Sequence, residues 1–281
     1  MNNHSLCELF LRTDFQKAWA DCDPFEKVEQ LQGAVFRQLE ARKTLRFEQN
    51  GSSFFIKIHR GVGWYEIIEN LIRLRTPVLG AENEYLAIRK LEELGIDTMT
   101  AVAYGKKGIN PARQRSFIVT EDLINTISLE DFCHRWQQIP ATFRFKKNLI
   151  DKLAEVSRRL HKNGVNHRDY YICHFLLAIP DGVENIDPDN FKVSLIDLHR
   201  TQIRKQTPKR WIRKDIAGLY FSALEAHCGL TRRDVFRFIK VYTGLPLRQA
   251  LHDYHWLWCG LEQKAQKLLT RTQRKSGGQS C

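Results

Sequence analysis

The sequence of 281 residues has no apolar run that approaches the ~18 residues needed by a membrane-spanning helix. Its opening stretch, Met1–Trp19, carries Glu8 and Asp14 and lacks the basic-then-apolar order of a secretion signal. There is no internal repeat, and low complexity is limited to a short polar tail at 276–281. These absences predict a folded protein of the cytoplasm.

Paired cysteines are also lacking. The seven cysteines are scattered singly along the chain, and none belongs to a Cys-x-x-Cys pair. Their odd number and wide spacing argue against a disulfide framework and against a structural zinc site. We therefore expect reduced and largely inert thiols.

Acidic residues are in the minority, because 44 Lys and Arg face 32 Asp and Glu, which gives a net charge of +12. Such a surplus favours a polyanionic partner: a nucleic acid, an anionic membrane or a phosphorylated substrate. The motifs of nucleic-acid binders are missing, including zinc-finger spacing and a basic region that leads into heptads. We therefore expect no nucleic-acid partner, and a merely solvated basic surface remains the alternative.

The first part of the chain is rich in strand patterns. Asp23 has the sequence context of a helix N-cap, and Asn50-Gly51 lies between two alternating runs, at 44–48 and 53–59, as in a β-hairpin. On the second run alternate side chains should face opposite sides of the sheet. The further elements that we expect are helices at 64–75 and 82–95 and strands at 100–104 and 116–121.

The second part of the chain is mostly helical. We expect helices opening at Ser128 and then at 145–163, 214–227, 231–243 and 254–274, with a small β element at 172–179 and 191–198. The predicted fold is α+β with two lobes. A small antiparallel-sheet lobe spans 1–122, and a mainly helical lobe spans 123–281.

Four residues stand where phosphoryl-transfer chemistry would need them. Asp169, in the loop Asn166-His167-Arg168-Asp169, could orient and deprotonate a hydroxyl, and Asp197, after an apolar strand, could hold Mg²⁺. Lys57 stands in an apolar strand, where an ammonium is costly unless it meets an anion. Glu84 is its candidate partner, and Glu82 is the rival.

In this order and at these separations, the four residues and His167-Arg168 resemble the signature of protein-kinase-like phosphotransferases. Longer strings narrow the resemblance to the lipopolysaccharide core heptose(I) kinases of Gram-negative bacteria. These strings are Asp23-Pro24-Phe25, Leu31-Gln32-Gly33, Ile58-His59-Arg60-Gly61, Pro77-Val78-Leu79-Gly80-Ala81, Asn166-His167-Arg168-Asp169, Tyr171-Ile172-Cys173-His174-Phe175-Leu176-Leu177 and Ile196-Asp197-Leu198-His199-Arg200.

The resemblance implies a kinase fold that uses ATP and Mg²⁺. It implies that Lys57 binds the ATP phosphates and is steadied by Glu84, and that Asp169 is the catalytic base. It places Asp197 on Mg²⁺ and Glu121 in the segment whose backbone binds adenine. Asp215 is implied to brace the catalytic loop from a buried helix.

The sequence departs from the kinase pattern at three points. The glycine-rich loop is reduced to Asn50-Gly51-Ser52, and Asp197 is followed by Leu-His in place of Phe-Gly. His174 occupies the position of the usual second magnesium ligand, an asparagine. Histidine is a poorer ligand for a hard cation. His174 is therefore a candidate metal ligand, a substrate contact or a core histidine.

Seven cations lie between Arg200 and Lys214, and the resemblance places this segment beside the acceptor. The candidate contacts to a core–lipid A acceptor are Arg168, Arg200, Lys209 and Arg210. The implied reaction is phosphorylation of the first core heptose, at O4, on the cytoplasmic face of the inner membrane. Other acceptors stay open: another core sugar such as Kdo, an aminoglycoside or a protein tyrosine.

Each assignment has a plainer alternative. Arg168 and Asp169 could form a loop ion pair, Asp197 could cap a turn, and Lys57 could extend to solvent from an edge strand. The basic segment could be solvated surface. The C-terminal helix, with its cations and Trp256 and Trp258, could touch an anionic membrane or pack against its own lobe.

Overall fold

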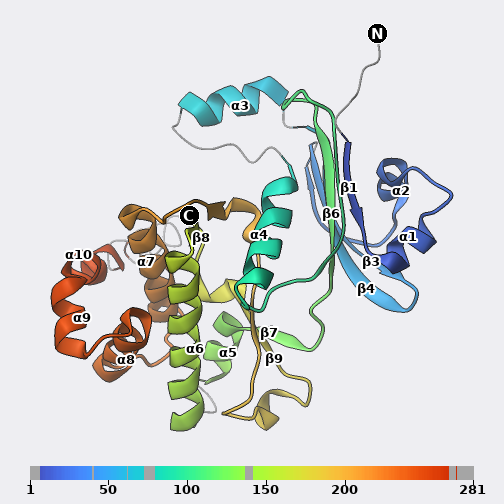
Figure 1. Ribbon diagram of the computed structural model, residues 1–281. Coiled ribbons are helices and arrows are strands. Elements are labelled where there is room, and N and C mark those ends of the chain that lie inside the picture. Colours follow the sequence, from blue (N-terminus) through green and yellow to red (C-terminus); the bar gives the residue numbers. More distant parts are fainter. Residues whose placement is uncertain are drawn as a thin grey trace, which may run out of the picture. The chain divides into compact units, whose positions relative to one another are not determined.

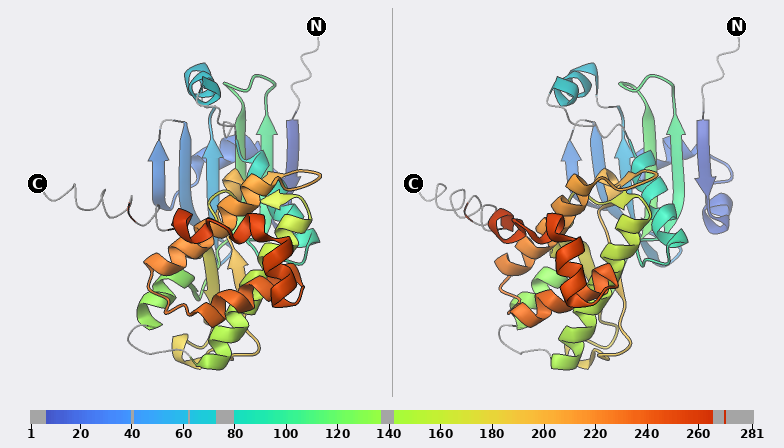
Figure 2. Two further views of the ribbon diagram at one scale, coloured as in Figure 1. Left: turned by 90° about the vertical axis from the view of Figure 1, so that its left-hand side faces the viewer. Right: turned by 60° about the vertical axis from the view of Figure 1, so that its left-hand side comes forward.

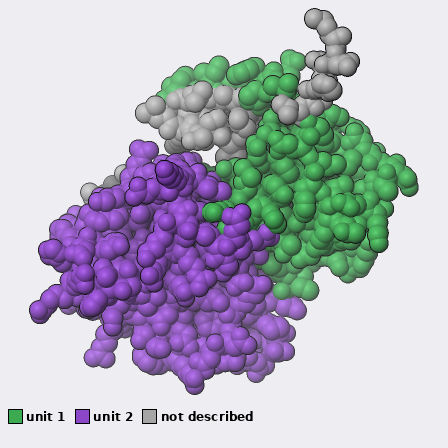
Figure 3. All heavy atoms as spheres, viewed as in Figure 1, with its two compact units in different colours: residues 1–90, 99–124, 197–200 green, residues 91–98, 125–196, 201–281 purple. Residues whose placement is uncertain are grey.

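The computed structural model divides into two compact units (Figure 3). The residues that it describes are 7–39, 41–61, 63–72, 80–136, 142–265 and 270. The first unit contains residues 1–90, 99–124 and 197–200, and the second contains 91–98, 125–196 and 201–281. The chain thus changes unit after Ile124, two residues beyond the division that we placed after Asp122, and two short segments belong to the opposite unit from their neighbours.

The first unit is built on a six-stranded antiparallel sheet with the strand order β1-β5-β6-β4-β3-β2 (Figure 1). Figure 2 shows these strands side by side. The strands are β1 Cys7–Leu11, β2 Ala34–Leu39, β3 Arg42–Gln49, β4 Ser52–His59, β5 Ala101–Lys107 and β6 Arg115–Glu121.

The turn between β3 and β4 confirms the predicted hairpin. Asn50 has φ 52° and Gly51 has φ 75°, and Gln49 pairs with Ser52 across the turn. A two-residue turn with positive φ at both positions favours Asn-Gly and matches the twist of the strands. The hairpin fixes the register of β4 and therefore the face on which each of its side chains lies.

The two faces of this sheet are covered by different helices. Helices α1 and α2 lie on one side and α4 on the other (Figure 1). Phe54, Ile56 and Ile58 of β4 are buried in one cluster with Phe15 of α1 and Phe25 of α2. Lys57 lies on the opposite face, as the alternation predicts. The helices of this unit are α1 Thr13–Ala18, α2 Pro24–Gln30, α3 Gly63–Ile72 and α4 Glu82–Glu93.

The second unit is mainly helical. It also carries a three-stranded sheet in the order β10-β9-β7 and a two-stranded pair, β11 with β8. Its helices are α5 Leu129–Trp136, α6 Phe143–Lys162, α7 Lys209–Glu225, α8 Arg232–Thr243, α9 Leu247–Asp253 and α10 His255–Trp258. Its strands are β7 Thr126–Ser128, β8 Val165–Asn166, β9 Phe175–Ala178, β10 Val193–Leu195 and β11 Gln202–Ile203.

Four helices of this unit, α6, α7, α8 and α10, share an apolar core. Ala154 of α6, Ile216 of α7, Tyr242 of α8 and Leu257 of α10 are buried together, and Leu261 joins them. Leu257 and Leu261, in the described part of the C-terminal segment, thus pack within their own unit, as the second of the two alternatives given for this segment expects. No helix among the described residues combines the length and the apolar character needed to cross a bilayer.

The expectation of unpaired thiols is wrong at two positions. Cys133 of α5 and Cys228, just after α7, form a disulfide with their Cα atoms 5.2 Å apart. They are separated by 95 positions in the sequence. Local spacing carries no information about such a pair, because the fold alone brings α5 and α7 together. Cys7, Cys22, Cys173 and Cys259 take part in no disulfide.

Two helix boundaries also differ from those predicted. The expected helix at 254–274 begins at His255 and is interrupted at Cys259 and Gly260, the latter with a left-handed φ of 76°, and most of 266–281 lies outside the described residues. Helix α7 begins at Lys209 rather than at 214. The expected loop of cations is therefore partly the first turns of a helix.

Candidate active site

Strand β4, helix α4 and the segment 197–200 bring together three of the predicted site residues in the first unit. Lys57 Nζ lies 2.7 Å from Glu84 Oε1 and 3.8 Å from Asp197 Oδ1. The rival Glu82 is engaged elsewhere, because its carboxylate binds Lys106 at 2.8 Å. The strand alternation and the helix register place Lys57 beside Glu84, and the segment 197–200 adds the second carboxylate within 4 Å of the ammonium.

The electrostatics of Lys57 follow from this arrangement. Burial lowers its pKa, but Glu84 and Asp197 more than offset that effect, so the pKa of Lys57 lies above its ordinary value. Glu84 is only 2% exposed, and its Oε2 atom has no hydrogen-bond partner among the described residues. A charged lysine is thus secured at the site, as a phosphate-binding group requires.

Asp197 is held in an uncommon backbone conformation. Its φ is 61°, and its Oδ1 accepts a hydrogen bond of 2.6 Å from Nδ1 of His199. A non-glycine residue with positive φ persists only where its surroundings enforce it, and such residues gather at functional sites. The side chain of Asp197 is 33% exposed and can therefore reach a ligand.

The second unit holds the predicted catalytic loop. Asp215 of α7 is buried, and its carboxylate accepts from the backbone N–H of His167 at 2.7 Å and of Arg168 at 2.9 Å. The ring Nε2 of His167 donates to the carbonyl of Ile196 at 2.9 Å. Arg168 has φ 76°, which the two bonds to Asp215 help to maintain. The brace that we expected from Asp215 is present.

Asp169 and His174 are linked through the backbone. Nδ1 of His174 lies 2.7 Å from the carbonyl oxygen of Asp169. Because a carbonyl only accepts, Nδ1 must carry the proton, so Nε2 is the atom through which His174 would contact a ligand. The contact fixes the ring against the loop that presents the half-buried Asp169 side chain.

The remaining predicted site residues are distributed as follows. The Glu121 side chain forms an ion pair with Arg12, and its N–H donates to the carbonyl of Thr100. The backbone N–H of Glu121 is therefore not available to adenine. A backbone N–H that donates to adenine would have to follow Glu121 in the chain. Arg200 belongs to the first unit, in the turn Leu198–Arg200. Arg168, Lys209 and Arg210 belong to the second.

Sequence reasoning missed several residues that support the site. His199 binds Asp197, and Trp211 lies under the guanidinium of Arg168, 5.2 Å from it. Nε2 of His161 lies 3.5 Å from Asp215, and Nδ1 bonds to the Tyr242 hydroxyl at 2.9 Å. A histidine two positions after Asp197 was a usable signal. The others depend on the packing of α6, α7 and α8.

The first unit's donors fit a magnesium ion that is shared with a nucleotide. Among the described residues no group of three or more His, Cys, Asp or Glu side chains could enclose a metal. Mg²⁺ is commonly held by one or two carboxylates together with substrate phosphates and water. Asp197, a partly exposed carboxylate beside a lysine, supplies the hard oxygen donor that this mode needs.

Comparison with known proteins identifies the family. The lipopolysaccharide kinase (Kdo/WaaP) family matches residues 26–242. The chain belongs to this family. The lipopolysaccharide core heptose(I) kinase WaaP of Pseudomonas aeruginosa is 52% identical over 95% of this chain and 97% of its own length. The namesake from Escherichia coli (strain K12) is 49% identical over 94% of this chain and 98% of its own.

A solved structure, WaaP in complex with acyl carrier protein, is 49% identical and has a TM-score of 0.80 over 93% of this chain and 99% of its own. The resemblance drawn from the motif strings is thereby confirmed, and so is the α+β kinase-like fold. As a member of the Kdo/WaaP family the chain is a phosphotransferase that acts on a sugar hydroxyl.

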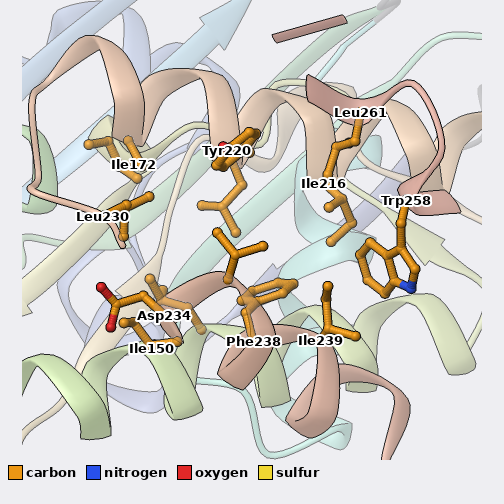
Figure 4. Close-up of a pocket in the computed structure, with 14 residues that line it drawn as sticks. Ile150, Ile172, Ile216, Tyr220, Leu230, Asp234, Phe238, Ile239, Trp258 and Leu261 are labelled. Atoms are coloured by element: carbon orange, nitrogen blue, oxygen red, sulfur yellow. The ribbon is translucent and has the colours of Figure 1, made fainter. Parts of the chain in front are cut away.

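This Kdo/WaaP family member also has an apolar cavity inside its second unit, of about 100 Å³ (Figure 4). Its walls come mainly from α6, α7, α8, α10 and the segment after α10. Ile216, Phe238, Ile239 and Trp258 are among the lining residues. Asp234 lies at its edge, where it binds Lys146 at 2.7 Å. A cavity with such walls excludes polar reactants and suits a hydrocarbon.

Proposed function

We propose that this protein transfers the γ-phosphoryl group of ATP to the first heptose of the lipopolysaccharide inner core, at O4. The observation that carries the proposal is the similarity to curated heptose(I) kinases, at about half identity over nearly the full length of both chains. The proposed acceptor is a heptose. Kdo, aminoglycosides and protein tyrosine are not proposed as main substrates.

In this proposal the first unit holds the nucleotide. Lys57 binds the α- and β-phosphates, Glu84 keeps the ammonium in place, and Asp197 binds Mg²⁺. The bound metal neutralises charge on the phosphates. The segment that includes Glu121 lies at the adenine. The support is the Lys57–Glu84–Asp197 arrangement, in which each carboxylate lies within 4 Å of the ammonium.

Asp169 is proposed as the group that orients the heptose hydroxyl and accepts its proton. The hydroxyl oxygen forms a bond to the γ-phosphorus as the bond from that phosphorus to the β–γ bridging oxygen breaks, and ADP leaves. Phosphoryl transfer needs little covalent assistance, so the main requirement is a fixed loop. The two hydrogen bonds from the loop backbone to Asp215 meet that requirement.

The acceptor is proposed to contact Arg168, Arg200, Lys209 and Arg210, with Nε2 of His174 as a further contact or metal ligand. Inner core and lipid A carry carboxylates and phosphates, which guanidinium and ammonium groups bind well. We place the reaction in the cytoplasm, with peripheral contact to the anionic face of the inner membrane, because the acceptor is a lipid and the chain carries a charge of +12.

Replacement of Asp169 tests the proposal. With purified enzyme, ATP, Mg²⁺ and a heptose-bearing core acceptor, Asp169→Asn should lower kcat at least about 100-fold, the usual contribution of a positioned base. Asp181→Asn, an exposed change of the same chemistry in the same unit, should leave kcat unchanged. Mass spectrometry should locate the new phosphate on the heptose. Undiminished transfer by Asp169→Asn would remove the aspartate from its role.

A second proposal concerns a protein partner, an acyl carrier protein. It is supported by the similar solved structure, in which WaaP is in complex with acyl carrier protein, and by the apolar cavity of the second unit. An acyl chain is the hydrocarbon that such a carrier presents. Acylated carrier should raise the Tm of this protein more than unacylated carrier, and Ile239→Trp, which fills the cavity, should abolish the difference. Equal effects of both carriers on the wild-type protein would argue against this use of the cavity.

A further inference from the structure

Five cationic side chains of the second unit pack on two indole rings. The Arg168 guanidinium lies 5.2 Å from the ring centroid of Trp211, Arg210 lies at 5.3 Å and Lys214 at 5.5 Å. Trp256 carries two more, Lys209 at 5.1 Å and Arg213 at 6.0 Å. We call these seven residues the cation–indole array.

The cation–indole array places several positive charges at the N-terminal end of a helix, where positive charge is unfavourable. Four of its cations belong to the first turns of α7, which has no acidic residue in its first turn and no side-chain cap. The positive end of the helix dipole repels cations there. Burial lowers the pKa of the neighbouring Arg204, and the charge of Arg210 lowers it further. Ring contacts offset this repulsion only in part, since each cation–π contact is weak at an exposed site.

Carboxylates do not balance the charges of Lys209 and Arg210 locally. Lys209 and Arg210 are exposed, and no carboxylate among the described residues lies within ion-pair distance of either head group. Exposed cations that lack a local counterion, as Lys209 and Arg210 do, and that pack on aromatic rings have the features of an anion-binding surface.

The array is tied to the catalytic loop at three points. Arg168, which packs on Trp211, is the residue before Asp169. Asp215, one residue beyond Lys214, binds the loop backbone. The hydroxyl of Thr207, two residues before α7, donates to the carbonyl of Val165 at 3.3 Å. An anion bound to the array is therefore held at a set position relative to the loop.

We infer that Trp211 is a positioning residue that orders Arg168 and Arg210 to bind an anionic group of the acceptor other than the hydroxyl that reacts. The group is an oxyanion, either a phosphate monoester or a carboxylate. The inference rests on the proposed function for the identity of the acceptor. The inference adds that the affinity of the enzyme for the acceptor depends on an anionic substituent and not on the heptose alone.

The test compares Trp211→Leu, which removes the ring, with Trp211→Phe, which keeps an aromatic face. With the intact acceptor, Trp211→Leu and Arg210→Gln should each raise KM roughly 3- to 10-fold, the effect of losing one partly exposed charge-assisted contact. Neither should change kcat more than about 2-fold, because neither contacts the reacting atoms. Trp211→Phe should retain a KM near that of wild type.

Two altered acceptors identify the source of the anion. One has its phosphate monoesters removed by a phosphatase, and the other has its carboxylates converted to amides. Wild-type KM should rise with the acceptor that lacks the bound group, and with that acceptor the added effect of Arg210→Gln should disappear. The second acceptor should keep the full effect of Arg210→Gln.

Arg232→Gln is the matched control, because Arg232 is an exposed cation in the first turn of α8 and lacks an aromatic neighbour of this kind among the described residues. It should leave KM unchanged for every acceptor. Equal KM values for wild type, Arg210→Gln and Trp211→Leu with the intact acceptor would overturn the inference.

A binding measurement separates this inference from the proposed function. Calorimetric titration of the deacylated core oligosaccharide, without ATP, should show the same loss for Arg210→Gln and Trp211→Leu. If no preparation transfers phosphate to heptose but this loss is found, the proposed reaction is wrong and the anion site stands. If wild type and Arg210→Gln bind the oligosaccharide equally, the anion site is wrong. Arg210→Gln decides the matter even if Trp211→Leu fails to fold.

Discussion

His59 ends β4 on the same face as Lys57 and is only 7% exposed, with its Nδ1 atom unpartnered among the described residues. Burial lowers its pKa, and the charges of Arg42, Lys57 and His199 lower it further, to about 4 from an ordinary 6.5. Between these two pH values the unfolded chain binds a proton that the folded chain does not. The free energy of unfolding should therefore fall as the pH drops from 6.5 to 4, by roughly 2–3 kcal/mol in all.

Urea unfolding of wild type and His59→Gln at pH 7 and pH 5 measures this contribution. The loss of stability between the two pH values should be smaller in the variant, by about 1–2 kcal/mol. The carboxylates that titrate below pH 5 contribute equally to both proteins and so cancel in the difference. Identical losses would show that His59 is protonated in the folded state at pH 5.

The sequence predicts individual residues well where a local pattern constrains them. Lys57 stands out because an ammonium in an apolar strand needs an anion, and the pairing with Glu84 follows from the helix that presents it. The burial of His59 and the contact of His199 with Asp197 were not predicted. Both depend on how the turn at 197–200 joins the first unit, which no local pattern specifies.

At the scale of elements, Gly164 decides how α6 is joined to the catalytic loop. It lies between α6 and β8 with φ 78°, and a Cβ atom there would lie 1.7 Å from the carbonyl oxygen of Arg204. Gly164→Ala should lower the free energy of unfolding by roughly 3 kcal/mol or more, because a backbone segment must move. It should also lower kcat, since β8 leads directly into the loop.

Gly229→Ala is the control for backbone strain alone. Gly229 also has a left-handed φ, 59°, but no atom among the described residues lies within 4 Å of the position that a Cβ would take there. Its replacement should cost about 1–2 kcal/mol and leave kcat unchanged. Chemical denaturation and steady-state assays of the two variants separate strain from collision. Equal losses of stability in both variants would show that the Arg204 backbone moves away from the added methyl group at no cost in free energy.

Element boundaries were predictable where side chains mark them. Asp23 caps α2 by accepting from the N–H of Phe25 at 2.7 Å, as its sequence context predicts. The start of α7 was missed because cations in a first turn oppose the helix dipole, so the pattern favours a later start. The predicted helix at 254–274 was too long because apolar periodicity does not register the turn at Gly260.

At the scale of the whole molecule, the order of elements predicts the α+β fold, since a strand-rich part precedes a helical part. The assignment of 91–98 to the second unit and of 197–200 to the first was beyond the sequence. These short segments have no composition that distinguishes them. Their placement depends on long-range pairing, such as the contact of Thr98 with Leu195. The disulfide was missed for the same reason.

The disulfide should make the stability of the second unit depend on redox conditions. Its bridge closes a long loop, so its formation restricts the unfolded chain, by up to about 4 kcal/mol. Without reductant, Cys228→Ser should therefore lower the free energy of unfolding, whereas with a dithiol reductant it should match wild type. Cys173→Ser, at a half-buried cysteine outside the disulfide, should show no such redox dependence.

Peptide mapping should find Cys133 and Cys228 alkylated only after reduction. Because a reducing cytoplasm keeps such thiols unpaired, the enzyme at its proposed location would work with this bridge open, and kcat should be the same in both redox states. A kcat that changes with the bridge would mean that α5 and α7 transmit its state to the catalytic loop.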